Sequence, residues 1–376
     1  MEERILVTRS SMPSLDEYIE EIRPLWESRW LTNAGGKHEE FRRALGDRLG
    51  VGGRIELFAN GHLALECALE ALGLGDDGRD EVVTTPYTFA STVHAVVRCG
   101  LRPVFVDVRP SDFTIDPEKI EAAVTERTCA VLGVHVYGSP CDDDSIEEIA
   151  VRHGLKVVYD AAHAFGVLRH GSPVASWGDA SMLSLHATKV FHSVEGGVVC
   201  FRDQTLGDRL RAWRNFGIDP ATGEVVYTGG NAKMDEFRAA MGICNLRHVD
   251  DWIADRARAE ARYRERLSGV PGIRLVSLAP DVSPNHIYMP ALFDPEVFGV
   301  SRDDVLGVLD AHGIGSRRYF HPLVTDFACY RGAFDLDVTP VAREATARVL
   351  TLPLYEGLSD VDVDRICDIV ISCGKE

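Results

Sequence analysis

The sequence has little that would place it in a membrane or on nucleic acid. No apolar run approaches the roughly 20 residues that a membrane-spanning helix needs, and the first residues, Met1 to Leu6, lack a signal peptide's basic start and apolar middle. The formal net charge is −18, whereas nucleic acid and anionic membranes both bind basic surfaces. We therefore expect a cytoplasmic protein that has neither nucleic acid nor membrane as a partner.

Cysteine is present but shows no pattern. The nine cysteines are scattered along the 376 residues without a Cys-x-x-Cys pair, and most lie in apolar segments. We expect reduced core thiols, with no disulfide frame and no metal site. A composition of 45% hydrophobic and 26% charged residues is typical of a globular protein, and the length allows one large core plus a smaller domain.

Short apolar runs alternate with helical stretches between residues 55 and 200. This alternation predicts the α/β class, with a mostly parallel central sheet flanked by helices. The predicted strands are residues 55–58, 81–85, 103–107, 130–135, 155–160, 180–184 and 197–201.

Helices are predicted on both sides of this region. Ser14-Leu-Asp-Glu17 is a capping-box pattern for a helix that runs to about Trp26, and a second short helix begins at about Glu39. Between them, the loop at residues 30–36 is either a plain turn or part of a ligand site. A long helical stretch at about 234–267 leads into a smaller α+β part. We place a large domain at residues 1–250 and a small C-terminal domain at 251–376.

The stretch from Ser184 to Gly197 combines a single lysine, hydroxyl groups and paired glycines between two predicted strands. A lysine between apolar walls has its charged form destabilised. This lowers its pKa and frees the neutral amine to condense with an aldehyde. We interpret Lys189 as a Schiff-base lysine. These residues alone leave open a surface lysine in a hairpin loop, since most lysines are exposed.

Asp160 ends the predicted strand 155–160 and is followed by two alanines and His163. One interpretation is a helix N-cap. The other is an anion against a protonated heterocyclic nitrogen, the partner that a pyridine cofactor needs to act as an electron sink, with His163 at the same ring. Because ligands collect at the carboxyl ends of parallel strands, Asp160 and Lys189 are expected in one crevice, and this pairing favours the catalytic interpretation of Lys189.

Two more strand ends carry candidate groups. Asn60-Gly61-His62 follows the first strand, where the free amides of a helix start can hold a phosphate, although many strand-to-helix corners carry a glycine. Phe89 follows the second strand, and either packs in the core or stacks on a planar ring.

With these motifs in this order, the chain resembles the nucleotide-sugar aminotransferases, pyridoxal 5'-phosphate enzymes of the fold-type-I scaffold. The likeness runs from about Trp30 to the end and rests also on Pro103-Val-Phe-Val-Asp107, His135-Val-Tyr-Gly138 and Gly230-Asn231-Ala-Lys-Met234. It implies that Lys189 anchors the cofactor and carries protons, and that Asp160 pairs with the pyridinium nitrogen. It further implies that Phe89 stacks on the ring and that the phosphate is bound by Ser184, by the amides of Gly61 and His62, and by Asn231 of the neighbouring subunit in a homodimer with shared sites.

The chain departs from the family in two places. Asn60-Gly61-His62 replaces the usual Ser/Thr-Gly-Thr, which affects the side-chain part of the phosphate site, and His163 replaces a common Gln. A dehydratase branch of the family has histidine in place of the lysine, so the presence of Lys189 favours transamination.

The closest likeness is to members that aminate C4 of a dTDP-4-keto-6-deoxyhexose. The resemblance therefore implies dTDP-4-keto-6-deoxy-D-glucose as acceptor and L-glutamate as donor, in the biosynthesis of an amino sugar for an antibiotic, another natural product or a glycan. The alternatives are a 3-keto sugar aminotransferase, a lyase, or a nucleotide-sugar-binding protein without turnover. Lys189 with Asp160 argues against the last, because a binder needs neither an imine-forming amine nor an electron sink.

An anionic dTDP sugar needs local cations on so acidic a protein. Lys37, Arg317 and Arg318 are the predicted substrate-binding cations, although each one singly could be an ordinary solvated charge.

Overall fold

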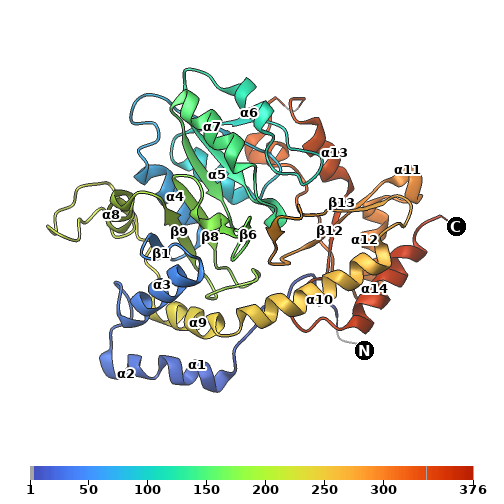
Figure 1. Ribbon diagram of the computed structural model, residues 1–376, viewed down its shortest axis with the longest axis horizontal. Coiled ribbons are helices and arrows are strands. Elements are labelled where there is room, and N and C mark those ends of the chain that lie inside the picture. Colours follow the sequence, from blue (N-terminus) through green and yellow to red (C-terminus); the bar gives the residue numbers. More distant parts are fainter. Residues whose placement is uncertain (1–3, 336, 376) are drawn as a thin grey trace.

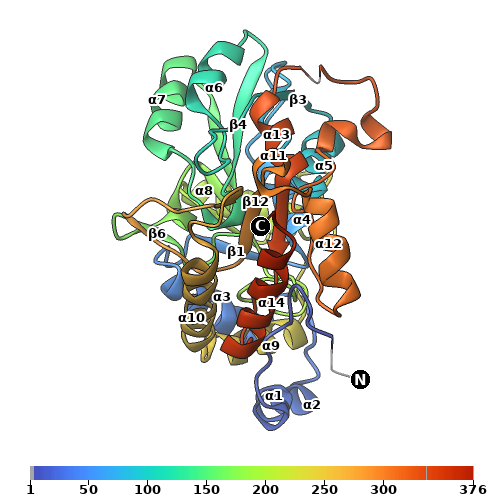
Figure 2. The ribbon, with the colours of Figure 1, turned by 90° about the vertical axis from the view of Figure 1, so that its right-hand side faces the viewer.

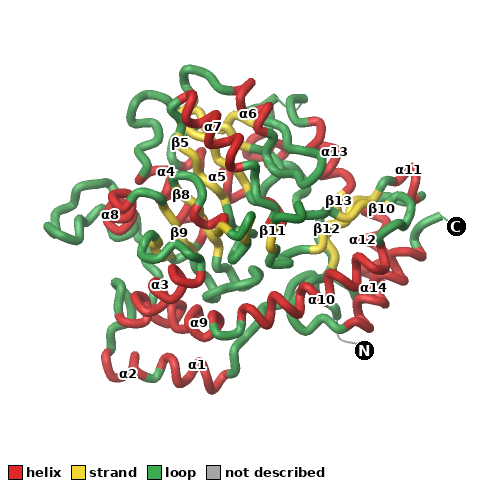
Figure 3. The backbone as a smooth tube through the Cα atoms, viewed as in Figure 1, coloured by secondary structure: helices red, strands yellow, loops and turns green. Residues whose placement is uncertain are grey.

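The computed structural model describes residues 4–335 and 337–375, and a twisted mixed sheet lies at its centre (Figures 1 and 3). Within these residues the sheet has seven strands in the order β1-β9-β8-β5-β4-β2-β3. The strands are β1 (Ile55–Phe58), β2 (Glu81–Thr84), β3 (Arg102–Phe105), β4 (Thr128–Val134), β5 (Lys156–Asp160), β8 (Ala180–Ser184) and β9 (Gly197–Phe201). Only β9 runs antiparallel to its neighbours in this sheet, so the predicted α/β class and the predicted strands are confirmed, with ends that shift by one or two residues.

Helices cover both faces of the sheet, because alternate residues of each strand point to opposite sides. Val199 of β9 packs in the core beneath one group of helices, whereas Val198 packs in the core on the other face. The first face carries α4 (Gly61–Ala71), α5 (Ala90–Arg98) and α8 (Gln204–Trp213), and the second carries α3 (Gly36–Arg48), α6 (Pro117–Ala123) and α7 (Asp143–His153). The strands are buried on both faces, which explains their continuous apolar runs.

The first helix is shorter than the sequence predicts. α1 (Leu15–Ile22) starts as expected after Ser14, whose hydroxyl accepts a hydrogen bond from the Glu17 amide at 3.2 Å. A second helix, α2 (Pro24–Ser28), begins at Pro24, whose ring lacks the amide hydrogen that a continuous helix would use. The Glu17 carboxylate binds Arg247 at 2.9 Å instead of accepting a hydrogen bond from the Ser14 amide. The capping box is therefore only half formed.

The long helix predicted at 234–267 is two helices, α9 (Glu236–Leu246) and α10 (Val249–Leu267), separated at Arg247 and His248. α10 runs from α9 across the lower half of the molecule toward the right in Figure 1 and leads to a second, antiparallel sheet of β10 (Ile273–Leu275), β12 (Met289–Phe293) and β13 (Val349–Leu352). α12 (Arg302–Ala311) and α14 (Asp360–Ser372) complete this part, and α14 lies beside α10 (Figure 2). The domain boundary at residue 250 stays a prediction.

Short elements connect the two parts. β11 (Val282–Ser283) pairs with β6 (Leu168–Arg169), which also pairs with β7 (Ser172–Pro173). The remaining elements are α11 (Pro295–Phe298), α13 (Pro340–Arg348) and the single 3-10 turns Val136–Gly138, Val174–Ser176, Val324–Asp326 and Ala328–Tyr330. Among the helices of the described residues, none is long and apolar enough to cross a membrane.

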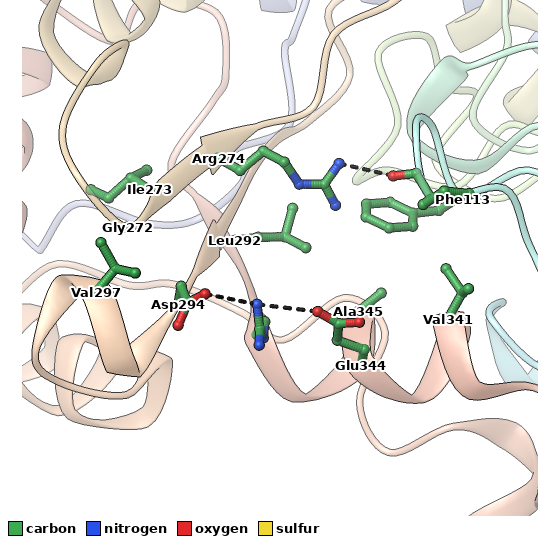
Figure 4. Close-up of a pocket in the computed structure, with 12 residues that line it drawn as sticks. Phe113, Gly272, Ile273, Arg274, Leu292, Asp294, Val297, Val341, Glu344 and Ala345 are labelled. Carbon is green, nitrogen blue, oxygen red and sulfur yellow. Dashed lines mark hydrogen bonds and ion pairs between the residues drawn. The ribbon is translucent and has the colours of Figure 1, made fainter.

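A cavity of about 470 Å³ lies where the second sheet meets the loop after β3 (Figure 4). Arg274 of β10 donates a hydrogen bond to the carbonyl oxygen of Pro110 at 2.8 Å and lies 5.0 Å from the ring centre of Phe113. Arg348 of α13 forms an ion pair with Asp294 at 3.1 Å. Both arginines therefore have partners, and the contacts of Arg274 join the second sheet to the loop after β3.

Candidate active site

A cavity of about 600 Å³ lies at the carboxyl ends of β1, β2, β4, β5 and β8. This is the edge where an α/β sheet binds ligands, because helix N-termini and loops converge there. One wall comes from Arg317, Tyr319 and Phe320, which belong to the C-terminal part of the chain. The cavity brings together the predicted residues Gly61, His62, Phe89, Asp160, His163, Ser184, Lys189 and Arg317.

Lys189 lies on the turn between β8 and β9. The strand pairing continues into this turn through hydrogen bonds from the Leu185 amide to the Gly196 oxygen and from the Ala187 amide to the Val194 oxygen, both 2.8 Å. A side chain at Gly197 would collide with the backbone oxygen of Asn60. The glycines therefore allow the lysine turn to lie directly against the start of α4.

The Lys189 amine is enclosed but unpaired. Burial lowers its pKa from the usual 10.5 to about 8, against the opposing influence of the negative charge of Asp160 and of Tyr319. Within the described residues, its Nζ takes part in no hydrogen bond or ion pair. The amine is therefore available for bond formation near neutral pH, as a Schiff-base lysine requires.

We predict a distinctive pH dependence for the capture of pyridoxal 5'-phosphate by the cofactor-free protein. Only the neutral amine attacks an aldehyde, and its fraction rises as pH increases towards the pKa. The capture rate should rise about tenfold from pH 6 to pH 7 and level off above about pH 8. Stopped-flow absorbance measures this rate, with Nα-acetyl-lysine as the reference amine. A rate that keeps rising to pH 10 would show that burial does not lower the pKa of Lys189.

Asp160 is a buried carboxyl group with no cation within ion-pair distance among the described residues, although the charge of Lys189 acts on it through space. Its Oδ2 accepts a hydrogen bond from the Thr92 hydroxyl at 2.6 Å, and its Oδ1 accepts one from the Ala162 amide at 3.1 Å. Burial raises its pKa, and these hydrogen bonds oppose the rise. Asp160 makes no ion pair within the described residues. An isolated buried carboxylate is costly, so this position fits a ligand that brings its own positive charge.

The N-terminus of α4 supplies an anion site at another wall of the cavity. The Asn60 side chain accepts a hydrogen bond from the Leu63 amide at 2.9 Å. The amides of Gly61 and His62 have no acceptor in the part of the chain that the structure describes. Ser184 lies beside them, since a Cβ at Gly61 would come within 3.1 Å of the Ser184 Cβ. Two free amides, a hydroxyl and the helix dipole together fit a phosphate group.

The His62 ring is held at the edge of this anion site. Its Nδ1 lies 2.9 Å from the Ser91 hydroxyl, and its Nε2 lies 3.1 Å from Glu66. These two partners occupy both ring nitrogens. His62 can therefore offer a phosphate its amide but not its ring, and its side chain joins α4 to α5.

His163 and Phe89 offer two ring surfaces to the cavity. The Nδ1 atom of His163 accepts a hydrogen bond from the Tyr137 amide at 3.2 Å, and burial holds its pKa well below the usual value. The ring is therefore neutral, with its proton on Nε2. His163 also stacks on Phe320 at 5.8 Å. Phe89 is 60% exposed, so its ring is free to cover a flat ligand.

Three predicted residues do not line this cavity. The Lys37 ammonium is paired with Glu21 and Glu40. Arg318 forms an ion pair with Asp303 at 2.7 Å and lines a neighbouring cavity. The Asn231 side chain accepts a hydrogen bond from Lys233 at 2.7 Å on an exposed segment.

Several lining residues were not singled out from the sequence, namely His186, Glu195, Tyr288 and Tyr319. His186 and Glu195 lie on the same turn as Lys189, so their closeness to the lysine in the sequence could have marked them as candidates. Tyr288 and Tyr319 come from the C-terminal part, and no local pattern marks them. The Tyr319 hydroxyl accepts a hydrogen bond from Arg317 at 2.7 Å.

These groups together fit pyridoxal 5'-phosphate, whose aldehyde, pyridine nitrogen and phosphate match the free amine, the lone carboxylate and the open helix N-terminus. Such a site at this edge of a mostly parallel sheet defines the class of pyridoxal-phosphate-dependent aminotransferases with the fold-type-I scaffold. The chain belongs to the DegT/DnrJ/EryC1/StrS aminotransferase family, which matches residues 14–371. It is thus an aminotransferase, and pyridoxal 5'-phosphate is its cofactor.

Two relatives are similar over nearly their whole length. The chain is 40% identical to a dTDP-4-amino-4,6-dideoxy-D-glucose transaminase of Shigella dysenteriae, covering 98% of this chain and 99% of the relative. It is 38% identical to the transaminase of the same name of Escherichia coli, covering 98% of both. The solved structure of DesI in the presence of its TDP-sugar product superposes with a TM-score of 0.94 at 36% identity, over 99% of this chain and 93% of that chain.

Proposed function

We propose that this enzyme transfers the amino group of L-glutamate to C4 of dTDP-4-keto-6-deoxy-D-glucose, giving dTDP-4-amino-4,6-dideoxy-D-glucose and 2-oxoglutarate. One observation carries the proposal: the free amine of Lys189 and the lone carboxylate of Asp160 line one cavity, in a chain nearly co-extensive with two transaminases named for this product. The 3-keto sugar and binding-only alternatives have no such support.

Each functional group of the protein has a separate role in the proposed reaction. The bound cofactor supplies an aldehyde that exchanges amino groups and a pyridine ring that accepts electrons from the reacting carbon. Asp160 keeps the ring nitrogen protonated, and the α4 amides with Ser184 hold the phosphate. Lys189 anchors the cofactor between turnovers. Once released, its neutral amine takes the α-proton of glutamate, and in the second half it delivers a proton to C4 of the sugar.

A comparison of the 4-keto and 3-keto dTDP sugars as substrates tests the proposal directly. Purified enzyme with cofactor and glutamate should convert the 4-keto dTDP sugar to an amino sugar with one 2-oxoglutarate released per sugar, as mass spectrometry and a coupled assay would show. The 3-keto dTDP sugar should react at least about 100-fold more slowly, because its reacting carbon lies one ring position away from the aligned amine. Preference for the 3-keto sugar, or no turnover of either, would overturn the assignment.

We also propose a homodimer in which Asn231 of one chain serves the cofactor phosphate of the other. Two features support it: Asn231 lies outside its own cavity, and the segment around it exposes Phe216 and Val225, 51% and 70% accessible in the single chain. Exposed apolar groups of this size are typical of an interface between subunits.

Mixed chains should reveal shared sites. Lys189→Ala and Asn231→Ala proteins are each expected to be nearly inactive, whereas their heterodimer has one site with both residues intact. Unfolding and refolding an equal mixture should restore about a quarter of wild-type activity, since half the dimers are mixed and one site of each is complete. Mixed dimers isolated by two affinity tags provide the check. Their inactivity would mean that Asn231 serves its own chain.

The cytoplasmic location and the biosynthetic pathway stay predictions from the sequence and its resemblance. Fractionation of the source cells would test the first.

A further inference from the structure

The chain before α1 forms a non-helical segment, residues 4–13, which we call the N-terminal strap. It is bound to the C-terminal part of the chain at two points. The Ile5 oxygen accepts a hydrogen bond from the Gly315 amide at 2.7 Å, and the Val7 oxygen accepts one from the Leu354 amide at 3.1 Å. The strap lies before the part of the chain that matches the family, so family membership assigns it no role.

His192 joins this strap to the turn that carries Lys189. Its side chain is buried, and its Nε2 donates a hydrogen bond to the Ser11 oxygen at 2.6 Å. Its Nδ1 accepts a hydrogen bond from the Val194 amide at 3.1 Å. Burial lowers the pKa of His192, so the ring is neutral near pH 7, and the two hydrogen bonds fix its single proton on Nε2.

Asn245 of α9 holds the backbone of the same histidine. The Asn245 amide nitrogen donates a hydrogen bond to the His192 oxygen at 2.8 Å, and this contact is buried. The strap and α9 therefore fix His192 at two separate points. Neither Ser11 nor Asn245 lines the cavity that contains Lys189, so these contacts act on the lysine turn and not on a ligand.

Val194 has an unfavourable backbone conformation. Its φ is 68°, in the left-handed region that β-branched residues rarely adopt. The Val194 amide is held by the His192 ring, and the Val194 oxygen accepts a hydrogen bond from the Ala187 amide at 2.8 Å. The second of these hydrogen bonds closes the loop 187–194, which contains Lys189. Backbone strain of this kind persists only where the surrounding contacts hold it in place.

We propose that His192 is a positioning residue for Lys189: its ring holds Val194 in the left-handed conformation, and Val194 keeps the loop closed with the lysine amine inside the cavity. The strap orients the ring through Ser11. One series of hydrogen bonds thus joins the C-terminal part of the chain, the strap and the lysine turn. This inference concerns the lysine turn alone and applies whichever keto sugar is the acceptor.

The rate at which the cofactor-free protein captures pyridoxal 5'-phosphate tests the inference, because capture involves Lys189 before any amino group is transferred. His192→Leu keeps apolar volume but loses both hydrogen bonds of the ring, so Lys189 should become more exposed to water. The pH at which capture levels off should rise from about 8 by about one unit, and the rate at pH 7 should fall about tenfold. Asp160 and Tyr319, the charged or titratable groups that act on this amine, are unchanged in the variant.

Two sets of variants separate positioning from a general loss of stability. His192→Asn places a carbonyl oxygen near the position of Nδ1 and keeps an acceptor for the Val194 amide, so its capture rate should stay within about threefold of wild type. Val194→Gly, added to His192→Leu, should raise the capture rate about threefold, because glycine adopts a positive φ without steric cost. Val194→Ala in the same background keeps the Cβ and should restore less.

His248→Leu is the matched control. The Nε2 of His248 also binds the N-terminal part of the chain, at 2.7 Å from Glu17 of α1, but among the described residues its side chain forms no hydrogen bond with the lysine turn. This variant should capture the cofactor like wild type. Hydrogen exchange of the peptide 185–197, measured by mass spectrometry without cofactor, should be faster in His192→Leu and unchanged in His248→Leu.

If His192→Leu does not fold, His192→Gln takes its place, because glutamine can still reach the Ser11 oxygen but offers no acceptor near Nδ1. A wild-type rate and pH dependence in these variants would show that His192 only fills space beneath the turn. The inference also fails if His192→Asn loses as much as His192→Leu, or if Val194→Gly restores no more than Val194→Ala. Such a failure leaves the transaminase proposal intact, since that proposal makes no use of His192.

Discussion

Lys189→Ala should lower turnover by more than the roughly 10²- to 10⁴-fold typical of losing a general acid or base alone. The proposed mechanism gives one side chain two tasks: its amine anchors the cofactor between turnovers and carries the proton at both reacting carbons. The structure leaves this amine unpaired in the cavity and lowers its pKa to about 8, so no neighbouring group needs to activate it. Arg317 also lines the cavity wall, but it lacks the primary amine that forms the imine with the cofactor and so cannot replace Lys189.

Cofactor binding should survive this substitution, because Asp160, Ser184 and the α4 amides remain. Equilibrium dialysis of Lys189→Ala with the aminated form of the cofactor should give an affinity within about tenfold of wild type. Borohydride treatment of the wild-type holoenzyme, followed by peptide mapping, should place the cofactor permanently on the peptide that contains Lys189.

Lys156→Ala is the control. Lys156 is a half-exposed lysine of the same sheet that pairs with Asp179 at 3.1 Å, and its loss should leave turnover unchanged. Label on another lysine such as Lys233, or substantial activity in Lys189→Ala, would remove Lys189 from the mechanism.

The sequence was most informative where local pattern and burial agree. The seven strands of the described sheet were predictable because most of their residues are apolar and buried between the two layers of helices, as in β4. The common cavity of Lys189 and Asp160 was predictable for a related reason. Asp160 ends one apolar strand and Lys189 lies on the turn that follows another, and ligands collect at such strand ends.

What the sequence missed depends on contacts between distant segments. The helix predicted at 234–267 breaks at Arg247 and His248, whose side chains bind Glu17 more than 200 positions away. Lys37 was predicted to bind substrate because it follows a glycine-rich loop, but Glu21 and Glu40 hold its ammonium. No periodicity encodes such pairings, since an ion pair depends on the tertiary fold and not on spacing.

The same limit applies to the wall supplied by the C-terminal part of the chain. Tyr288 and Tyr319 reach the cavity only because β12 and the segment after α12 fold back onto the first sheet. Arg317 and Arg318 are neighbours in sequence, yet they line different parts of the cavity system, and only Arg317 reaches the Lys189 cavity. The sequence identified two adjacent arginines but could not show which of them lines the Lys189 cavity.

Asp160→Asn should lower the rate of the glutamate half-reaction about 10²- to 10³-fold, the usual cost of removing a preorganised charge that stabilises charge in the transition state. Asparagine has the same shape but no charge, so the ring nitrogen loses the anion that favours its protonation. Asp160 forms no ion pair among the described residues, and Lys189 acts on it only through space, so the substitution breaks no ion pair in the cofactor-free protein. The unfolding temperature without cofactor should therefore stay within a few degrees of wild type or rise, since burial raises the pKa of the native carboxyl and shows its charge to be costly there.

Thr92→Val tests the orientation of the Asp160 carboxylate separately from its charge. The Thr92 hydroxyl donates its one hydrogen to Asp160 at 2.6 Å and accepts from the Thr88 hydroxyl at 2.7 Å, so valine removes one support of the carboxylate but leaves its charge. We expect a loss of about tenfold, which corresponds to one hydrogen bond to a charged group. Single-turnover absorbance with glutamate measures both variants, and cofactor dialysis reports their affinities. If Asp160→Asn keeps a rate within about threefold of wild type, or if Thr92→Val proves the more damaging of the two, the carboxylate is not the partner of the ring nitrogen and serves only to cap the turn at Ala162.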